Sequence, residues 1–246
     1  MKKIVPFVTI LLFGLYGAKL LIEDKLGWYI NKRYEGFFTL ATVICVVIGL
    51  VGVVFAAREK RKKDNHVVEQ NRTLAFLGYL PIIFTLVVGI SLAPKTLSAS
   101  SKPPQAISLY ALKNYSPEQI IKELKLGKNS RDYTFSDWLH IRDMDEKFKF
   151  QNGKQVKLTG LVIKPEGTPE DIFFVGRYLI ICCAVDATTF GFPVESETWR
   201  EVLNEGDWVG VQGHFEVKNK DGKNRLIIIP DNITKIPQPP DPYIYY

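Results

Sequence analysis

Long apolar stretches separated by charged loops fill the first part of the chain. Residues 36–57 and 73–94 contain no charged side chain, and residues 4–22 contain only Lys19. About 20 apolar residues are enough for a helix to cross the hydrocarbon core of a bilayer. A cleavable signal peptide is the alternative for the first stretch, but no small-residue cleavage pattern follows it. The sequence therefore predicts three transmembrane helices, in an anchor that spans residues 1–94.

The pattern changes after Pro94, where the rest of the chain has the composition of a globular protein. Residues 95–110 are small, polar and proline-bearing, which is typical of an extended tether. Residues 111–150 carry a helix-start signal at Ser116 and, further on, apolar side chains close to one helical face around Trp138. These features predict a tether followed by a short helical segment.

Short β-type runs separated by turn residues fill residues 151–246. The five clearest runs are residues 155–163, 173–187, 190–194, 205–215 and 225–229. A short helical pattern at residues 197–203 lies between the third and the fourth run. Five strands with a helix inserted late predict a soluble α+β domain built on a small OB-like β-barrel. A small α/β or sandwich arrangement is the alternative.

The run at residues 173–187 is the most apolar of the five and is interpreted as the central strand of the barrel. It contains Cys182 and Cys183 and ends near Asp186. Because neighbouring residues of a strand point to opposite faces, one cysteine is expected to face the core. The other cysteine, Asp186 and His214 offer thiolate, carboxylate and imidazole groups, which are all zinc ligands. Cys182, Cys183, Asp186 and His214 are therefore candidate metal ligands, with zinc as the candidate cofactor.

A structural interpretation of the same residues stays open and needs no bound cofactor. In it the two thiols are small wall residues, and Asp186 caps a turn or pairs with Arg177. Three cysteines without a paired C-x-x-C motif give neither a disulfide framework nor a zinc motif. The histidines His140 and His214 lack the surroundings of a catalytic base, so an enzyme is not expected.

The net charge of +6 owes much to one loop, in which lysine and arginine concentrate between Arg58 and Arg72. Such loops stay on the cytoplasmic side, which places the N-terminus inside and everything after Pro94 outside. Binding of anionic lipid headgroups is a second interpretation of this loop. An external domain without interleaved aromatic and basic residues favours no nucleic-acid partner. The lipid bilayer is the expected surroundings of the anchor.

Four segments of the chain resemble the YcgQ-type family of bacterial membrane proteins, which are described as permease subunits containing a domain of unknown function. The segments are residues 155–162, 176–187, 206–213 and 239–245. The resemblance implies pairing with a multi-span permease. In some members a histidine-rich cytoplasmic loop suggests metal, whereas the loop of this chain carries only His66.

These features favour a multi-pass cell-membrane accessory subunit of a two-component permease, whose extracytoplasmic domain contacts or gates the transporter. The alternative is a membrane-tethered extracytoplasmic binding module for a metal ion or small solute. An envelope structural protein is a third possibility. Four side chains are expected to serve as structural or partner-contact residues: Arg177, Trp208, Tyr243 and Tyr245. The two tyrosines, at the end of the chain, are expected to pack on the barrel.

Overall fold

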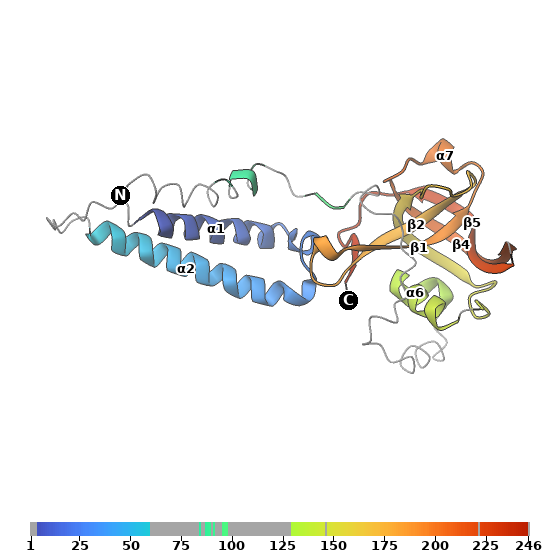
Figure 1. The fold of residues 1–246 in the computed structure, drawn as a ribbon, viewed down its shortest axis with the longest axis horizontal. Coiled ribbons are helices and arrows are strands. Elements are labelled where there is room, and N and C mark those ends of the chain that lie inside the picture. Colours follow the sequence, from blue (N-terminus) through green and yellow to red (C-terminus); the bar gives the residue numbers. More distant parts are fainter. Residues whose placement is uncertain are drawn as a thin grey trace. The chain divides into compact units, whose positions relative to one another are not determined.

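The computed structural model describes residues 4–59, 84, 87–89, 91, 95–97, 129–145, 147–220 and 222–245 (Figure 1). The chain divides into two compact units. The first consists of Met1–Lys95 together with Cys182–Ala184, and the second of Thr96–Ile181 together with Val185–Tyr246. Most of the third predicted span, the basic loop with His66, most of the predicted tether and the helix predicted from Ser116 lie outside the described residues.

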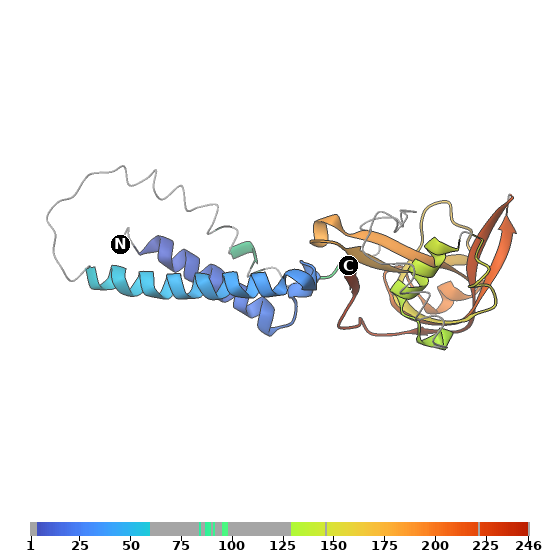
Figure 2. The same cartoon turned by 90° about the horizontal axis from the view of Figure 1, so that it is seen from below.

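The first unit is built on two long apolar helices, α1 (Val5–Ile22) and α2 (Glu35–Glu59), which lie side by side in both views (Figures 1 and 2). Pro6 stands in the first turn of α1, where its missing N–H breaks no helical hydrogen bond. Two single 3₁₀ turns, η1 (Leu26–Trp28) and η2 (Lys32–Tyr34), connect the helices. Both helices have the length and composition of membrane spans, or for α1 of a signal sequence.

Glycines let α1 and α2 approach closely. A Cβ added to Gly49 would lie 2.7 Å from the Leu11 backbone, and one added to Gly14 would lie 2.9 Å from the backbone nitrogen of Val46. Gly52 faces the ring of Phe7, at 1.9 Å from such a Cβ. In membranes, where apolar surface gives no drive for association, this close packing is what holds helices together.

The second unit begins with η5 (Ser130–Asp132) and α6 (Phe135–Met144). Thr134 and Asp137 form a capping box at the start of α6, each side chain accepting a hydrogen bond from the other's backbone N–H. Trp138 is completely buried and stacks edge-on against Phe215 of the barrel, with ring centroids 4.8 Å apart. The helix expected around Trp138 is therefore present, and its apolar side covers the barrel.

The rest of the second unit is a closed five-stranded β-barrel with a sixth short strand outside the ring. Around the ring the strands follow the order β1–β4–β5–β3–β2, and β2 pairs again with β1. All of these pairs are antiparallel except β3 with β5. The strands are β1 (Gln155–Ile163), β2 (Ile172–Ile180), β3 (Thr188–Glu195), β4 (Trp208–Lys220), β5 (Lys223–Lys235) and β6 (Tyr243–Tyr245). Helix α7 (Trp199–Val202) lies between β3 and β4, as expected for an OB-like barrel.

Large side chains from the strands, α6 and α7 fill the barrel core. The fully buried ones include Phe173, Phe192, Phe215 and Trp199. Where two strands cross closely only glycine fits, since a Cβ on Gly160 would lie 2.5 Å from the carbonyl oxygen of Gly176. Each of the five runs predicted from the sequence overlaps one strand of the barrel.

One predicted element is wrong. Residues 173–187 do not form a single strand, because β2 ends at Ile180 and β3 begins only at Thr188. The chain must reverse between them, since β2 and β3 pair antiparallel. Cys182 and Cys183 lie in this connection, so the alternation rule of strands does not apply to them. Neither cysteine faces the core: Cys182 is exposed and Cys183 is half-buried.

The end of the described chain packs on the barrel as β6. Tyr178–Ile180 of β2 pair in parallel with Tyr243–Tyr245 at the point where β2 has left β1. Tyr243 is buried, and its hydroxyl oxygen accepts a hydrogen bond of 2.7 Å from the backbone N–H of Leu97. Tyr245 is half-buried and contacts the Tyr243 ring.

Candidate functional site

The candidate site is the loop between β2 and β3, residues 181–187. Its backbone is fixed locally by Asp186, whose Oδ1 accepts a 3.0 Å hydrogen bond from the N–H of Ile181. A single 3₁₀ turn, η6 (Ala184–Asp186), then leads into β3. Asp186 therefore closes the turn that brings the cysteines and its own carboxylate into one short loop.

A second set of hydrogen bonds holds residues 182–184 within the first unit. The N–H of Asn31 donates to the carbonyl oxygen of Cys182 over 3.0 Å, and the N–H of Ala184 donates to the carbonyl oxygen of Tyr29 over 2.8 Å. Ile30 and Cys183 thereby form an isolated antiparallel bridge. The backbone that carries the thiols is thus tied to the connection between α1 and α2.

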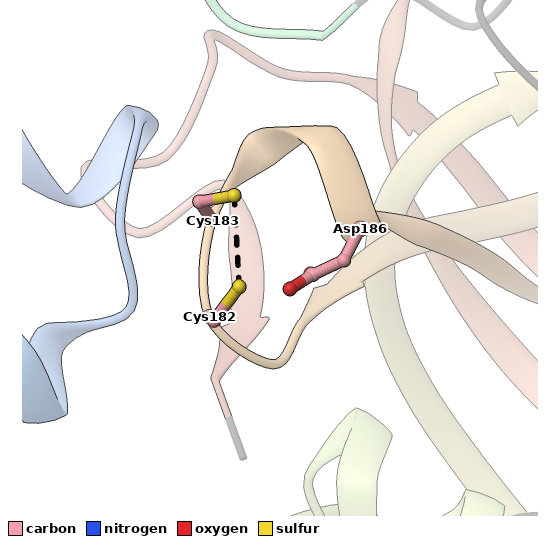
Figure 3. Close-up of side chains that lie close together, drawn as sticks. All are labelled: Cys182, Cys183 and Asp186. Carbon is pink, nitrogen blue, oxygen red and sulfur yellow. Dashed lines mark hydrogen bonds between the residues drawn. The ribbon is translucent and has the colours of Figure 1, made fainter.

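Three potential ligand atoms converge in this loop: the sulfur atoms of Cys182 and Cys183 and a carboxylate oxygen of Asp186 lie within 4.8 Å of one another (Figure 3). The two Sγ atoms are 3.6 Å apart. Two thiolates bound tetrahedrally at about 2.3 Å from a zinc ion would be separated by about 3.8 Å. The thiol spacing therefore already matches the bite of a tetrahedral metal site.

Exposure leaves one side of the cluster open. Cys182 is exposed, and Cys183 and Asp186 are half-buried. Structural zinc sites are closed by four protein ligands, whereas sites that exchange a ligand keep a position open. Three donors on a partly exposed loop fit the second kind.

His214, the fourth candidate, does not join the cluster. It lies in the middle of β4, opposite Gln155 on one side and Ile229 on the other. The group of donors that the described residues bring together contains only Cys182, Cys183 and Asp186. Sequence reasoning grouped His214 with them by chemistry alone, without a spacing that would require contact.

Arg177 is a structural residue of the barrel. Its guanidinium donates to the carbonyl oxygen and the hydroxyl of Thr159, at 2.8 and 2.7 Å, and to the carbonyl oxygen of Asp241 at 3.2 Å. Trp208 lies beneath it, with the ring centroid 5.6 Å from the guanidinium carbon. Burial lowers the pKa of Arg177, and the charge of Asp241 opposes that shift. Of the two structural roles considered for Asp186, capping a turn is observed, and the hydrogen bonds of Arg177 go elsewhere.

Residues 29–31 were not recognised from the sequence as partners of the site. Their contribution is backbone hydrogen bonding to a loop about 150 residues later, and backbone groups leave no residue-type pattern. Asn31 is the one trace: it is only 2% exposed, and its side chain caps η2 by accepting a hydrogen bond from the N–H of Arg33. An asparagine between two apolar helices can indicate a fixed turn, but it does not indicate which residues that turn contacts.

Comparison with known families covers nearly the whole chain. Residues 5–103 match the DUF1980 N-terminal domain, and residues 113–246 match the DUF1980 C-terminal domain. No curated protein matches the chain. The two matches name no permease and no activity. Because together the two matches leave only residues 1–4 and 104–112 uncovered, the chain belongs to the DUF1980 family, whose domains are of unknown function.

Proposed function

We propose that this chain is a membrane-tethered module that captures a thiophilic divalent cation of the zinc type through Cys182, Cys183 and Asp186. The observation that supports this function is the convergence of the three donors within 4.8 Å on one loop. Two thiolates and one carboxylate form a donor set that zinc accepts.

The open side of the cluster favours capture and release over a structural role. The part of the chain that the structure describes brings no fourth donor to the cluster, so the fourth position is left to water or to a donor of another molecule, which allows the ion to be passed on by ligand exchange. Asp186 links binding to loop geometry, because Oδ1 holds the N–H of Ile181 while the carboxylate also lies beside the thiols.

The proposed location is a multi-pass anchor with the barrel outside the cell. Residues 29–31 and 182–184 pair within one unit, so they must lie on the same side of a membrane. If α2 crosses the bilayer between them, the chain has to cross once more before Cys182. The sequence offers residues 73–94 for that crossing, and the basic loop between Arg58 and Arg72 then marks the cytoplasmic side.

The test is zinc binding by the full-length chain, purified in detergent under reducing conditions and titrated against a chromophoric chelator. We expect one zinc ion per chain. Cys182→Ser and Cys183→Ser should each weaken binding by about tenfold or more, because each removes one ligand. Asp186→Asn keeps an oxygen for the Ile181 N–H and removes the charge, so it isolates the carboxylate's contribution to the metal.

Cys45→Ser is the matched control, since Cys45 is the thiol that lies in α2, away from the loop. It should bind zinc as the wild type does. Absence of stoichiometric zinc from the reduced wild-type chain overturns the proposed function, and so does unchanged affinity in both loop cysteine variants.

The hypothesis that the chain is an accessory subunit of a permease requires a second membrane protein as its partner. The apolar sides of α1 and α2 expose large side chains, such as Phe13, Phe37 and Phe55, which suit lipid and a second membrane protein equally. Purification in mild detergent followed by mass spectrometry distinguishes the two. A stoichiometric multi-span protein supports a permease complex, and the chain alone supports a module that acts without an obligate transporter.

A further inference from the structure

We infer that Cys182 and Cys183 form a reversible disulfide with each other, and that this disulfide switches the metal site off. The inference rests on the proposed function for its consequence, but the covalent step is independent of any metal.

The two thiols are already close enough to react after a small rotation. Their sulfur atoms are 3.6 Å apart, and a disulfide requires about 2.05 Å. In an extended strand adjacent side chains would point to opposite faces, which would prevent the bond. Here the cysteines follow the end of β2, and their sulfur atoms turn toward one another (Figure 3).

Exposure decides which thiol reacts first. Cys182 is exposed and Cys183 is half-buried, so a small disulfide from solution reaches Cys182 more readily. The Cys182 thiolate attacks one sulfur of the small disulfide and releases one small thiol. The Cys183 thiolate then attacks the Cys182 sulfur of the mixed disulfide and releases the second thiol. Two protein thiols are oxidised and the small disulfide is reduced to two thiols, with the two cysteine protons ending on them.

A bond between adjacent residues encloses almost no chain, so it adds little stability through the unfolded state. Its effect is on chemistry: both thiolate donors disappear together, and Asp186 is left as a single half-buried carboxylate. The hydrogen bonds from Asn31 and to Tyr29 involve the loop backbone and not the sulfur atoms, so they can persist in both redox states.

The experiment uses the full-length chain carrying Cys45→Ser, in detergent, equilibrated with glutathione and glutathione disulfide at a series of ratios. Samples are quenched by alkylation and measured by intact mass. As the share of glutathione disulfide increases, we expect Cys182 and Cys183 to lose their reaction with the alkylating reagent together, in a single transition. The chain with the disulfide should also be about 2 Da lighter than the reduced chain when neither has been alkylated. Cys183→Ser in the same background should instead keep one glutathione on Cys182.

Zinc affinity is measured on the same samples. The oxidised chain should bind zinc at least about tenfold more weakly than the reduced chain, and a reductant should restore binding. Chains that accumulate only mixed disulfides or disulfide-linked dimers overturn the inference, whatever their zinc affinity. A reduced chain that binds no zinc overturns the proposed function and the switch, while the mass measurement still reports whether the bond forms.

Discussion

Gln151 is completely buried, yet neither its side-chain oxygen nor its nitrogen has a hydrogen-bond partner among the described residues. The indole nitrogen of Trp138 is in the same situation. A buried polar group without a partner costs about 1–3 kcal/mol relative to one that is hydrogen-bonded. The interior of the second unit therefore contains buried polar groups that lower its stability.

Replacing the amide tests that cost. Gln151→Met keeps a similar volume and removes both unpaired polar atoms, so the free energy of unfolding should rise by about 1–3 kcal/mol. Gln212→Met is the control, because Gln212 is exposed on β4 and its replacement should change stability by less than about 0.5 kcal/mol. Chemical unfolding followed by tryptophan fluorescence measures both. A loss of stability in Gln151→Met would show that the amide is satisfied in solution.

The lowered pKa of the half-buried His140 on α6 predicts that stability depends on pH. Burial lowers the pKa of His140 below 6.5, against the opposing charges of Asp143 and Asp137. The folded chain thus binds this proton less readily than the unfolded chain does. Its contribution to stability is complete above pH 6.5 and is lost as the pH falls from there through the lower folded pKa.

His140→Gln should remove that dependence. Between about pH 7.5 and about pH 5.5 the variant should lose less stability than the wild type, as measured by pulse proteolysis of the full chain in detergent. Equal losses in the two proteins would mean that other groups carry the acid sensitivity.

For single residues, the sequence indicated which side chains belong to the candidate site better than it indicated where those side chains lie. Their residue types made Cys182, Cys183 and Asp186 candidate metal ligands, and the structure brings these three side chains together. The prediction that one cysteine faces the core was wrong. Ile181 and Val185 are apolar although they are exposed, and the loop therefore has the sequence pattern of a continued strand β2. Local pattern records hydrophobicity, and only the antiparallel pairing of β2 with β3 shows where the chain turns.

Among the elements, the contact between α1 and α2 depends on glycine. Gly49→Val would place methyl groups against the Leu11 backbone, already 2.7 Å from an added Cβ, and should destabilise the helix pair by about 1–3 kcal/mol. Gly36→Val is the matched control in the same helix, since no atom of the described residues lies within 4 Å of its added Cβ. Thermal unfolding in detergent should show a lower midpoint for Gly49→Val alone. Equal midpoints would mean that the helices do not pack through Gly49.

The strands of the barrel could be predicted because each is a run of β-branched or aromatic residues flanked by turn residues. β6 could not be predicted in the same way. Three residues after a proline-rich segment give no periodicity, and their strand conformation comes from pairing with β2. Only the packing of Tyr243 and Tyr245 on the barrel could be predicted for this strand, because it follows from the chemistry of the tyrosine side chain.

For the whole molecule, the hydrogen bonds between residues 29–31 and residues 182–184 require both segments to lie on the same side of the membrane. Labelling of cysteines can measure which side that is. In intact cells, a membrane-impermeant maleimide should label Cys182 in a Cys45→Ser background. A cysteine introduced into the basic loop by the substitution Asn65→Cys should react only after the membrane is permeabilised. Labelling of the Asn65→Cys variant at that position in intact cells would contradict the proposed orientation.

β6 has a consequence for the order in which the protein is made. It pairs with β2, but β3, β4 and β5 are all synthesised between these two strands. Until residues 243–245 have emerged, the Tyr178–Ile180 edge of β2 has no cover from β6, immediately before the cysteine loop. An uncovered strand edge recruits other chains. A product that stops before Tyr243 would therefore be prone to aggregation, although all five strands of its barrel were complete.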